Sequence, residues 1–220
     1  MTILRAVADE PATLAELVAR TGLPRATAHR LAVALEGHRL VRRTPEGSWA
    51  PGPALSELSR SGTDLADIAG RHLATLRDAS GESAQFYVRD GATRVCVAAA
   101  ERASGLRDTV PVGARLPMTA GSAAHALLAF TPAEEVTRLL PAATFTARTL
   151  LEVRRRGWAH SVAEREPGVA SLSAPVRDAT GTVLGAVSIS GPVERLGRRP
   201  GPEVVGAVLD AAAAIARAAR

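Results

Sequence analysis

The chain has 220 residues, of which 46% are hydrophobic but only 3% aromatic, and it carries a formal net charge of +5. This length allows one large domain or two modest ones, with cores built from Ala, Val and Leu. The sequence has neither a run of about 18 apolar residues nor a signal-peptide pattern, which excludes a membrane-spanning helix and favours a cytoplasmic protein without a membrane partner. The single cysteine, Cys96, excludes an internal disulfide and a cysteine-based zinc cluster.

The positive charge is compatible with an anionic partner such as nucleic acid, but it does not prove one. All 27 basic residues are Arg, which together with the richness in Ala is typical of a GC-rich genome. Nucleic-acid binding therefore has to be argued from the positions of the arginines.

Residues 1–10 predict a short helix, and a second helix follows after a capping signal. Thr13 suits the N-cap position, and Glu16 three residues later completes a capping-box pattern. Gly22 is the expected end of the second helix.

A third helix and a hairpin complete the first predicted domain. Pro24 suits the first position of a helix that runs to about Gly37. Residues 39–50, RLVRRTPEGSWA, predict two short strands around a Thr-Pro-Glu-Gly turn. Three short helices and a hairpin within residues 1–53 are the pattern of a winged helix-turn-helix DNA-binding domain.

The third helix has an apolar side and a side suited to DNA. At 100° per residue, one stripe is predicted to face the core, namely Pro24, Ala28, Leu31 and Leu35. The opposite side and the hairpin carry the candidate DNA-binding residues, which are Arg25, Ala26, Thr27, His29, Arg30, Arg42 and Arg43.

These residue types suit distinct contacts. In a helix-turn-helix the second of the paired helices enters the major groove with its N-terminal residues toward the bases. Arg25 or Arg30 then suits a bidentate contact to guanine, and Thr27 a phosphate contact. The hairpin arginines suit flanking phosphates or the minor groove. The alternative is a solvated helix face beside an ordinary basic hairpin, and for His29 a solvated or packing role is favoured.

The remainder of the chain predicts a linker and a second domain. Residues 54–78 predict a linking helix, interrupted at Ser61-Gly62, and residues 79–220 a sensor domain. Two hairpins are expected to turn at Asp90-Gly91 and at residues 178–181. Helices are expected over residues 121–130, 132–140, 146–156 and 202–220. This mixture predicts an α+β fold around a central antiparallel sheet.

The sequence carries no signature of an enzyme. A Gly-x-Ser-x-Gly elbow, a P-loop and a Gly-x-Gly-x-x-Gly fingerprint are all missing, and no catalytic residue or cofactor is predicted. His160 and Glu164 stand four residues apart, but HSVAEREPG offers too few other ligands for a metal ion. Its EREPG segment is predicted to be a loop at the edge of a pocket.

Both halves of the chain resemble one protein family. LAELVARTGLPRATAHRLAVALEGHRLVRR, followed by PGPAL, resembles the DNA-binding half of the IclR family of bacterial transcriptional regulators. VGARLPMTAGSAAHALLAF and RRRGWAHSVAEREPGVASLSAPVRDATGTVLGAVSISGP resemble its GAF-like effector-binding half. GLPRATAHRLAVAL and GPAL are most similar to an actinobacterial branch concerned with amino-acid metabolism.

The resemblance implies homodimers, often associated as tetramers, that bind palindromic or near-palindromic double-stranded DNA. A small carboxylate or an amino-acid-related metabolite is the expected effector, and repression or activation is left open. Family members commonly have more residues before the first helix, and Gly-Lys where this chain has Ala124-His125. His125 is predicted to lie on a helix surface, and a contact with a charged ligand is the alternative.

The family pattern also implies which residues contact the effector. They come from the helix after RLPM, the RGW region and two later strands, and are Leu116, Ser122, Ala123, Ser161, Ser171, Ser188 and Ser190. Ser122 and Ala123 at a helix start offer N–H groups to an anion, and Ser188 and Ser190 alternate in a strand and so share a face. Strand packing or exposure is the alternative for any single serine.

A second function class stays open at this stage. The chain would then be a ligand-binding module whose degenerate N-terminal head contacts another protein instead of DNA. A salt-insensitive interaction of that head would favour this alternative.

Overall fold

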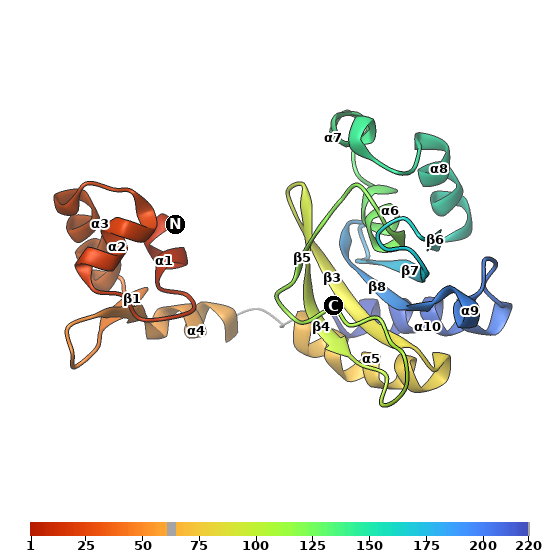
Figure 1. Cartoon of the computed structure of the whole chain (residues 1–220), viewed down its shortest axis with the longest axis horizontal. Coiled ribbons are helices and arrows are strands. Elements are labelled where there is room, and N and C mark those ends of the chain that lie inside the picture. The colour runs from red at the N-terminus through yellow and green to blue at the C-terminus, as the bar shows by residue number, and fades with distance from the viewer. Residues whose placement is uncertain (61–64, 220) are drawn as a thin grey trace. The chain divides into compact units, whose positions relative to one another are not determined.

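The computed structural model describes residues 1–60 and 65–219, and the chain forms two compact units, Met1–Asp64 and Leu65–Arg220 (Figure 1). The predicted helix interruption at Ser61-Gly62 lies outside the described residues.

The first unit contains the predicted succession of helices and a hairpin. The helices are α1 (Thr2–Ala6), α2 (Leu14–Thr21), α3 (Arg25–Gly37) and α4 (Pro53–Arg60), and the hairpin is β1 (Val41–Arg43) with β2 (Trp49–Pro51). The capping box of Thr13 and Glu16 and the left-handed Gly22 at the end of α2 are confirmed. Helix α1 is shorter than the predicted 1–10 and ends at Ala6, whose carbonyl oxygen accepts a hydrogen bond from the Arg20 guanidinium.

The buried stripe of α3 differs from the predicted one. Ala28 and Ala32 are fully buried, whereas Leu31 is 42% exposed and Pro24 is also exposed. The inclusion of Leu31 and Pro24 was therefore wrong, because α1 and α2 approach α3 over its small alanines and leave the flanks of that stripe in solvent. Trp49 joins the same core and pairs with Ala12, which fixes the hairpin to the segment between α1 and α2.

The second unit is built on one six-stranded antiparallel sheet in the order β5-β4-β3-β8-β7-β6. The strands are β3 (Ser83–Asp90), β4 (Thr93–Ala100), β5 (Arg115–Pro117), β6 (Ala159–Val162), β7 (Val169–Arg177) and β8 (Val183–Pro192). Both predicted hairpins are confirmed. The short edge strands β5 and β6 were not predicted, since three or four residues carry too little periodic pattern.

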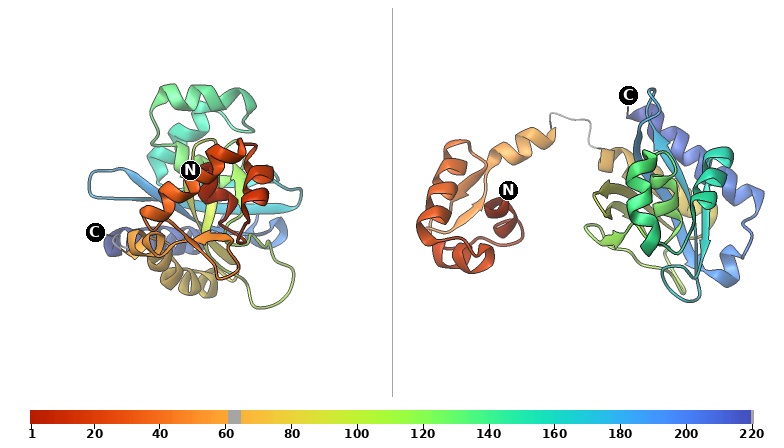
Figure 2. Two further views of the ribbon diagram at one scale, coloured as in Figure 1. Left: turned by 90° about the vertical axis from the view of Figure 1, so that its left-hand side faces the viewer. Right: turned by 90° about the horizontal axis from the view of Figure 1, so that it is seen from above.

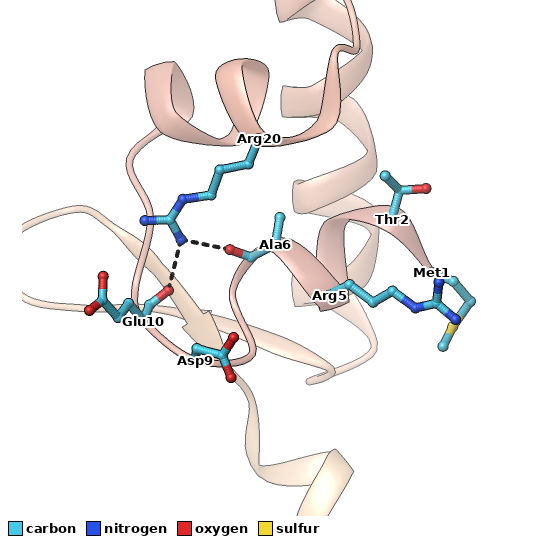
Figure 3. A pocket seen from close by; sticks show the side chains of 7 residues that line it. All are labelled: Met1, Thr2, Arg5, Ala6, Asp9, Glu10 and Arg20. Atoms are coloured by element: carbon cyan, nitrogen blue, oxygen red, sulfur yellow. Dashed lines mark hydrogen bonds between the residues drawn. The ribbon is translucent and has the colours of Figure 1, made fainter. Parts of the chain in front are cut away.

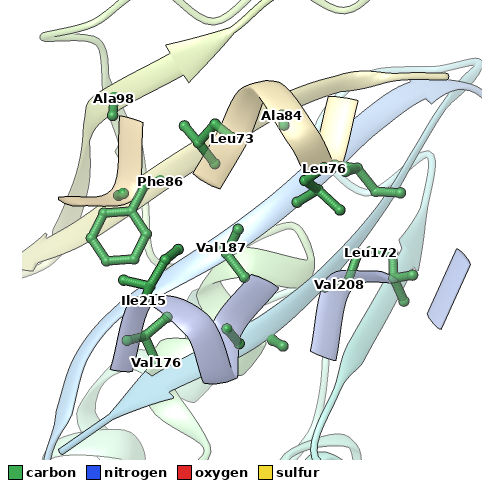
Figure 4. Packing of buried hydrophobic residues seen from close by; sticks show 14 of the residues in the cluster. Leu73, Leu76, Ala84, Phe86, Ala98, Leu172, Val176, Val187, Val208 and Ile215 are labelled. Carbon is green, nitrogen blue, oxygen red and sulfur yellow. The ribbon is translucent and has the colours of Figure 1, made fainter. Parts of the chain in front are cut away.

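Helices cover both faces of this sheet (Figures 1 and 2). On one face lie α5 (Leu65–Ser80) and α10 (Pro202–Ala218), which enclose a core that includes Leu73, Phe86 and Ile215 (Figure 4). On the other face lies α6 (Ser122–Leu128), with α8 (Ala147–Arg156) packed on it. The smaller helical elements are α7 (Ala133–Leu139), η1 (Leu140–Ala142) and α9 (Val193–Leu196).

The two faces differ in polarity because side chains alternate along each strand. In β7, Leu172 and Ala174 point into the core under α5 and α10, whereas Ser171 and Ser173 point to the α6 side. In β8, Ile189 enters that same core while its neighbours in the chain are the serines of the other face. The sheet thus presents a serine-rich patch beneath the start of α6.

Two glycine substitutions test the packing of this unit. A Cβ on Gly185 would lie 2.3 Å from Phe86 Cζ and 2.8 Å from the Tyr87 carbonyl oxygen, so Gly185→Ala should lower the free energy of unfolding by about 1–3 kcal/mol. A Cβ on Gly206 in α10 meets nothing within 4 Å, so Gly206→Ala should raise it by about 1 kcal/mol. Chemical denaturation of both variants measures these changes, and equal effects of the same sign would contradict this packing.

Candidate nucleic-acid interface and ligand cavity

The outward face of α3 carries most of the predicted DNA-binding residues. Arg25, Ala26, His29 and Arg30 are exposed there, and Thr27 is half-buried at the edge of that face. Among the described residues, no carboxylate forms an ion pair with Arg25 or Arg30. Val33, 43% exposed, also lies on this face and was missed, because an apolar residue was expected to be buried.

The two hairpin arginines are held differently. The Arg43 guanidinium lies over the ring of its cross-strand partner Trp49, 4.2 Å from the ring centroid, in a cation–π contact. Arg42 is exposed on the adjacent position of β1, whose side chain points to the other face of the strand. Of these two arginines, Arg42 is therefore the one whose guanidinium is more available for contact with a partner molecule.

A hollow beside α1 is lined by Met1, Thr2, Arg5, Ala6, Asp9, Glu10 and Arg20 (Figure 3). The Arg20 guanidinium donates hydrogen bonds there to the carbonyl oxygens of Ala6 at 2.7 Å and Glu10 at 3.3 Å. These bonds join α2 to the end of α1 and the segment after it. Arg20 therefore stabilises the fold of this unit.

In the second unit, a small cavity lies between the serine-rich patch and the start of α6. It is lined by Tyr87, Arg94, Asp108, Gly121, Ser122, Ala123, Ser161, Glu164, Arg165, Glu166, Val169, Ser171, Ser188 and Ser190. Its volume is about 20 Å³, which is room for about one water molecule. In this closed form the cavity does not admit a larger molecule without movement of its walls.

Six of the seven predicted effector contacts line this one cavity. The exception is Leu116 on β5, whose half-buried side chain packs against the apolar cluster around Cys96 and Met118. Leu116 is therefore not among the residues that line this cavity, although it pairs with the cavity residue Arg94 in the sheet.

The serine hydroxyls are bonded to one another across three strands and α6. Ser122 Oγ lies 2.7 Å from both Ser171 Oγ and Ser173 Oγ. Ser173 Oγ donates to Ser188 Oγ at 2.8 Å, and Ser161 Oγ lies 2.9 Å from Ser171 Oγ. Each of these buried hydroxyls therefore has a hydrogen-bond partner within the network.

The N–H groups at the start of α6 are largely taken, contrary to the expectation that they await an anion. The Gly121 N–H donates to Glu164 Oε2 at 2.9 Å, and the Ser122 N–H donates to Ser161 Oγ at 3.0 Å. A carboxylate of the protein itself already occupies this position, so a ligand must find its counter-charge elsewhere or displace Glu164.

His125 does not lie on the helix surface, and that prediction was wrong. Its side chain is fully buried, packs edge-on against Phe145 and places Nε2 2.9 Å from Glu164 Oε2. Its Nδ1 has no hydrogen-bond partner among the described residues. The helix turns this position inward because α8 covers the outer side of α6.

Glu164 links three segments through one oxygen. Besides Gly121 and His125, Thr144 Oγ1 donates to Glu164 Oε2 at 3.0 Å. Burial raises the pKa of Glu164, but the hydrogen bonds from His125, Gly121 and Thr144 outweigh that effect and hold the pKa below its usual range. The predicted loop at the pocket edge therefore carries the residue that closes it.

The charged residues of the cavity wall were not predicted from the sequence. Arg165 donates to Asp108 Oδ2 at 2.5 Å, and these two residues stand 57 positions apart in the chain. Arg94 is only 3% exposed and lies near the buried Tyr87, with 5.4 Å between its Cζ and the ring centroid. Nothing in the local pattern around these residues separates them from ordinary surface arginines.

In the part of the chain that the structure describes, no helix is both long and apolar enough to cross a bilayer. The same residues include no group of three or more His, Cys, Asp or Glu side chains placed to hold a metal ion.

Comparisons with known proteins agree for both units. Residues 1–45 match the IclR helix-turn-helix domain family, and residues 58–217 match the family described as bacterial transcriptional regulator IclR C-terminal. The chain is 34% identical to the glycerol operon regulatory protein of Streptomyces griseus, over 93% of this chain and 87% of that one. It is 30% identical to the transcriptional repressor IclR of Escherichia coli, over 83% and 74%. The crystal structure of Pseudomonas aeruginosa HmgR superposes with a TM-score of 0.65 at 26% identity, over 99% and 95%.

The pH dependence of the free energy of unfolding, compared between wild type and Glu164→Gln, tests the role of the Glu164 carboxylate. Because the folded state lowers the pKa of Glu164, its bonds stabilise the fold above the ordinary value of 4.5 and are lost as pH falls through the folded pKa. Wild type should exceed the variant in free energy of unfolding by about 1–2 kcal/mol near neutral pH, with a difference that shrinks in acid. Denaturation at several pH values measures this.

The matched control is Glu166→Gln, which removes the same charge from an exposed side chain two residues away. It should leave the stability and its pH dependence near wild type. A Glu164→Gln difference that stays constant from neutral to acid pH would count against the assigned role of this carboxylate.

Proposed function

The chain belongs to the IclR family of bacterial transcriptional regulators, and we propose that it binds a palindromic or near-palindromic operator under the control of an effector held in the serine-lined cavity. As a family member it is a transcriptional regulator with a helix-turn-helix DNA-binding unit and an effector-binding unit. The observation that carries the proposal is the pairing of an exposed basic helix and hairpin in one unit with a buried polar cavity in the other.

We assign residues 1–53 to DNA binding, 54–78 to the link and 79–220 to effector binding. Arg25 or Arg30 on the exposed side of α3 reads guanine in the major groove, and Ala26 allows the close approach of the backbone. Thr27 and Arg42 bind phosphates, with His29 and Arg43 beside them. Val33 extends the same face toward a thymine methyl group.

The protein acts as a homodimer, or a tetramer of two dimers, in the cytoplasm. Half-sites about 34–36 Å apart on the DNA demand two recognition helices at a matching distance, which a dimer supplies. We expect repression, in line with the name of the E. coli relative. The relatives are regulators, and we propose that the chain itself has no enzymatic activity.

Effector control requires two states of the protein that bind the effector unequally. The cavity and α5 lie on opposite faces of one sheet, and β3 carries residues of both, since Tyr87 lines the cavity and Phe86 packs under α5. Opening the cavity displaces these strands and shifts α5, most of which belongs to the proposed link, 54–78. A small carboxylate or amino-acid-related metabolite fits the polar lining.

DNA binding by the full chain tests the interface. We expect specific binding to DNA upstream of its own gene, measured by fluorescence anisotropy at two salt concentrations. Arg30→Ala should relax specificity at one operator position at a cost of roughly 1–3 kcal/mol. Arg42→Ala should weaken binding to all sequences alike and reduce the salt slope by about one unit.

Arg115→Gln, an exposed arginine of the effector-binding unit, is the control and should bind DNA as wild type does. If Arg30→Ala and Arg42→Ala both bind like wild type, the surface is misassigned. Salt-insensitive association, or none with any duplex, would favour a head that contacts protein instead.

A further inference from the structure

Arg94 is a buried cation of the cavity wall without an acidic partner. It stands on β4, is 3% exposed and forms no ion pair with any residue that the structure describes. Arg165 pairs with Asp108, and Glu164 bonds with His125, so these charged groups of the wall have direct side-chain partners. Arg94 is a buried charged group of this wall that forms no ion pair with the described residues.

The guanidinium is only partly hydrogen-bonded. Its Nη1 donates to the Pro117 carbonyl oxygen, which anchors one end of the fork. Its Nε is buried and has no acceptor in the described part of the chain. A buried donor without an acceptor costs about 1–3 kcal/mol and more when it is charged, so this arrangement calls for an external acceptor.

Arg94 keeps its charge at neutral pH. Burial lowers its pKa to about 10, partly offset by Tyr87, and that value still leaves the guanidinium protonated near pH 7. The nearby charges of Arg165 and Glu164 act on the pKa of Arg94 in opposite directions, Arg165 lowering it and Glu164 raising it.

The position of Nη2 relates this donor to the cavity. A Cβ on Gly121 would lie 3.1 Å from Arg94 Nη2, so the absence of a side chain at Gly121 allows the guanidinium to lie against the start of α6. Nε and Nη2 form one edge of the planar guanidinium, whose geometry matches the two oxygens of a carboxylate. That edge is distinct from the Nη1 bound to Pro117.

We propose that Arg94 is the anchor for the effector and that the cavity takes a small monocarboxylate, whose oxygens pair with Nε and Nη2 of Arg94. This inference rests on the proposed function, since it concerns the effector of the same cavity. The polar remainder of the molecule bonds to serines of the hydroxyl network that line the cavity, such as Ser171 and Ser188.

The other wall charges set the limits of the ligand class. Asp108, Glu164 and Glu166 also line the cavity, and a second negative group on the ligand would meet them. A dicarboxylate or a phosphate ester is therefore disfavoured. The lining has few apolar residues, chiefly Ala123 and Val169, so a hydroxy or oxo acid suits it better than a hydrocarbon chain.

The test compares acids with their uncharged amides on the full chain. Acetate, lactate and glycerate, each beside its amide and at constant ionic strength, are titrated by calorimetry into wild type, Arg94→Gln and Arg94→Lys. For wild type we expect at least one acid to bind with a Kd about tenfold or more below that of its amide. In Arg94→Gln this preference should fall to within about twofold, and Arg94→Lys, which keeps the charge but loses the planar fork, should lie between.

Arg115→Gln is the matched control, because it removes an exposed arginine from the adjoining strand β5 and should keep the wild-type preference. Circular dichroism and Tm establish folding, and if Arg94→Gln does not fold, the wild-type and Arg94→Lys titrations decide. Equal binding of every acid and its amide by wild type would overturn the proposal, as would an undiminished preference in a folded Arg94→Gln or, failing that, in Arg94→Lys.

Operator binding separates this proposal from the proposed function. If an acid binds through Arg94 but leaves operator affinity unchanged, the anchor stands and effector control through this cavity fails. If operator affinity responds to a neutral compound, equally in wild type and Arg94→Gln, control stands and the anchor fails.

Discussion

The register of the central strands is the constraint on which the effector-binding unit depends. Ser161 pairs with Ser171, Ser171 with Ser190, and Ser173 with Ser188, so hydroxyls from β6, β7 and β8 form rows on one face of the sheet. A shift by one residue would turn these hydroxyls into the core that α5 and α10 cover. Burying unpaired hydroxyls among apolar side chains is costly, and this cost opposes such a slip.

Given that register, the start of α6 and the loop before β7 complete the cavity. Ser122 joins the hydroxyl network, and Glu164 accepts bonds from Gly121, His125 and Thr144, so the loop, α6 and the segment before α8 are fastened at one oxygen. The result is a nearly filled cavity of about 20 Å³. Entry of an effector must therefore move a wall, and the loops that carry Glu164 and Asp108 are the parts not held in the sheet ladder.

Under the proposed function, this need for movement is what couples effector binding to DNA binding. A cavity that accepted its ligand without change would bind it equally in both states and would shift nothing. Here the strand that carries the cavity residue Tyr87 also carries Phe86 of the core beneath α5, and close packing transmits a displacement of that strand to the helix. In the proposed DNA-binding unit, α3 packs on the core through Ala28 and Ala32, and Trp49 joins the hairpin to the same core.

The sequence by itself determined the features that depend on only a few neighbouring residues. The capping box of Thr13, the end of α2 at Gly22, the two hairpin turns and the shared face of Ser188 and Ser190 all follow from local backbone chemistry or from the period of a helix or strand. The tertiary structure alone decided the burial of His125, the exposure of Leu31, the role of Glu164 and the unpaired charge of Arg94. The physical reason is that these properties depend on which distant segments pack against a residue, as with Arg165 and Asp108, which are 57 positions apart. The residues next to a position in the chain do not show which distant residues will contact it.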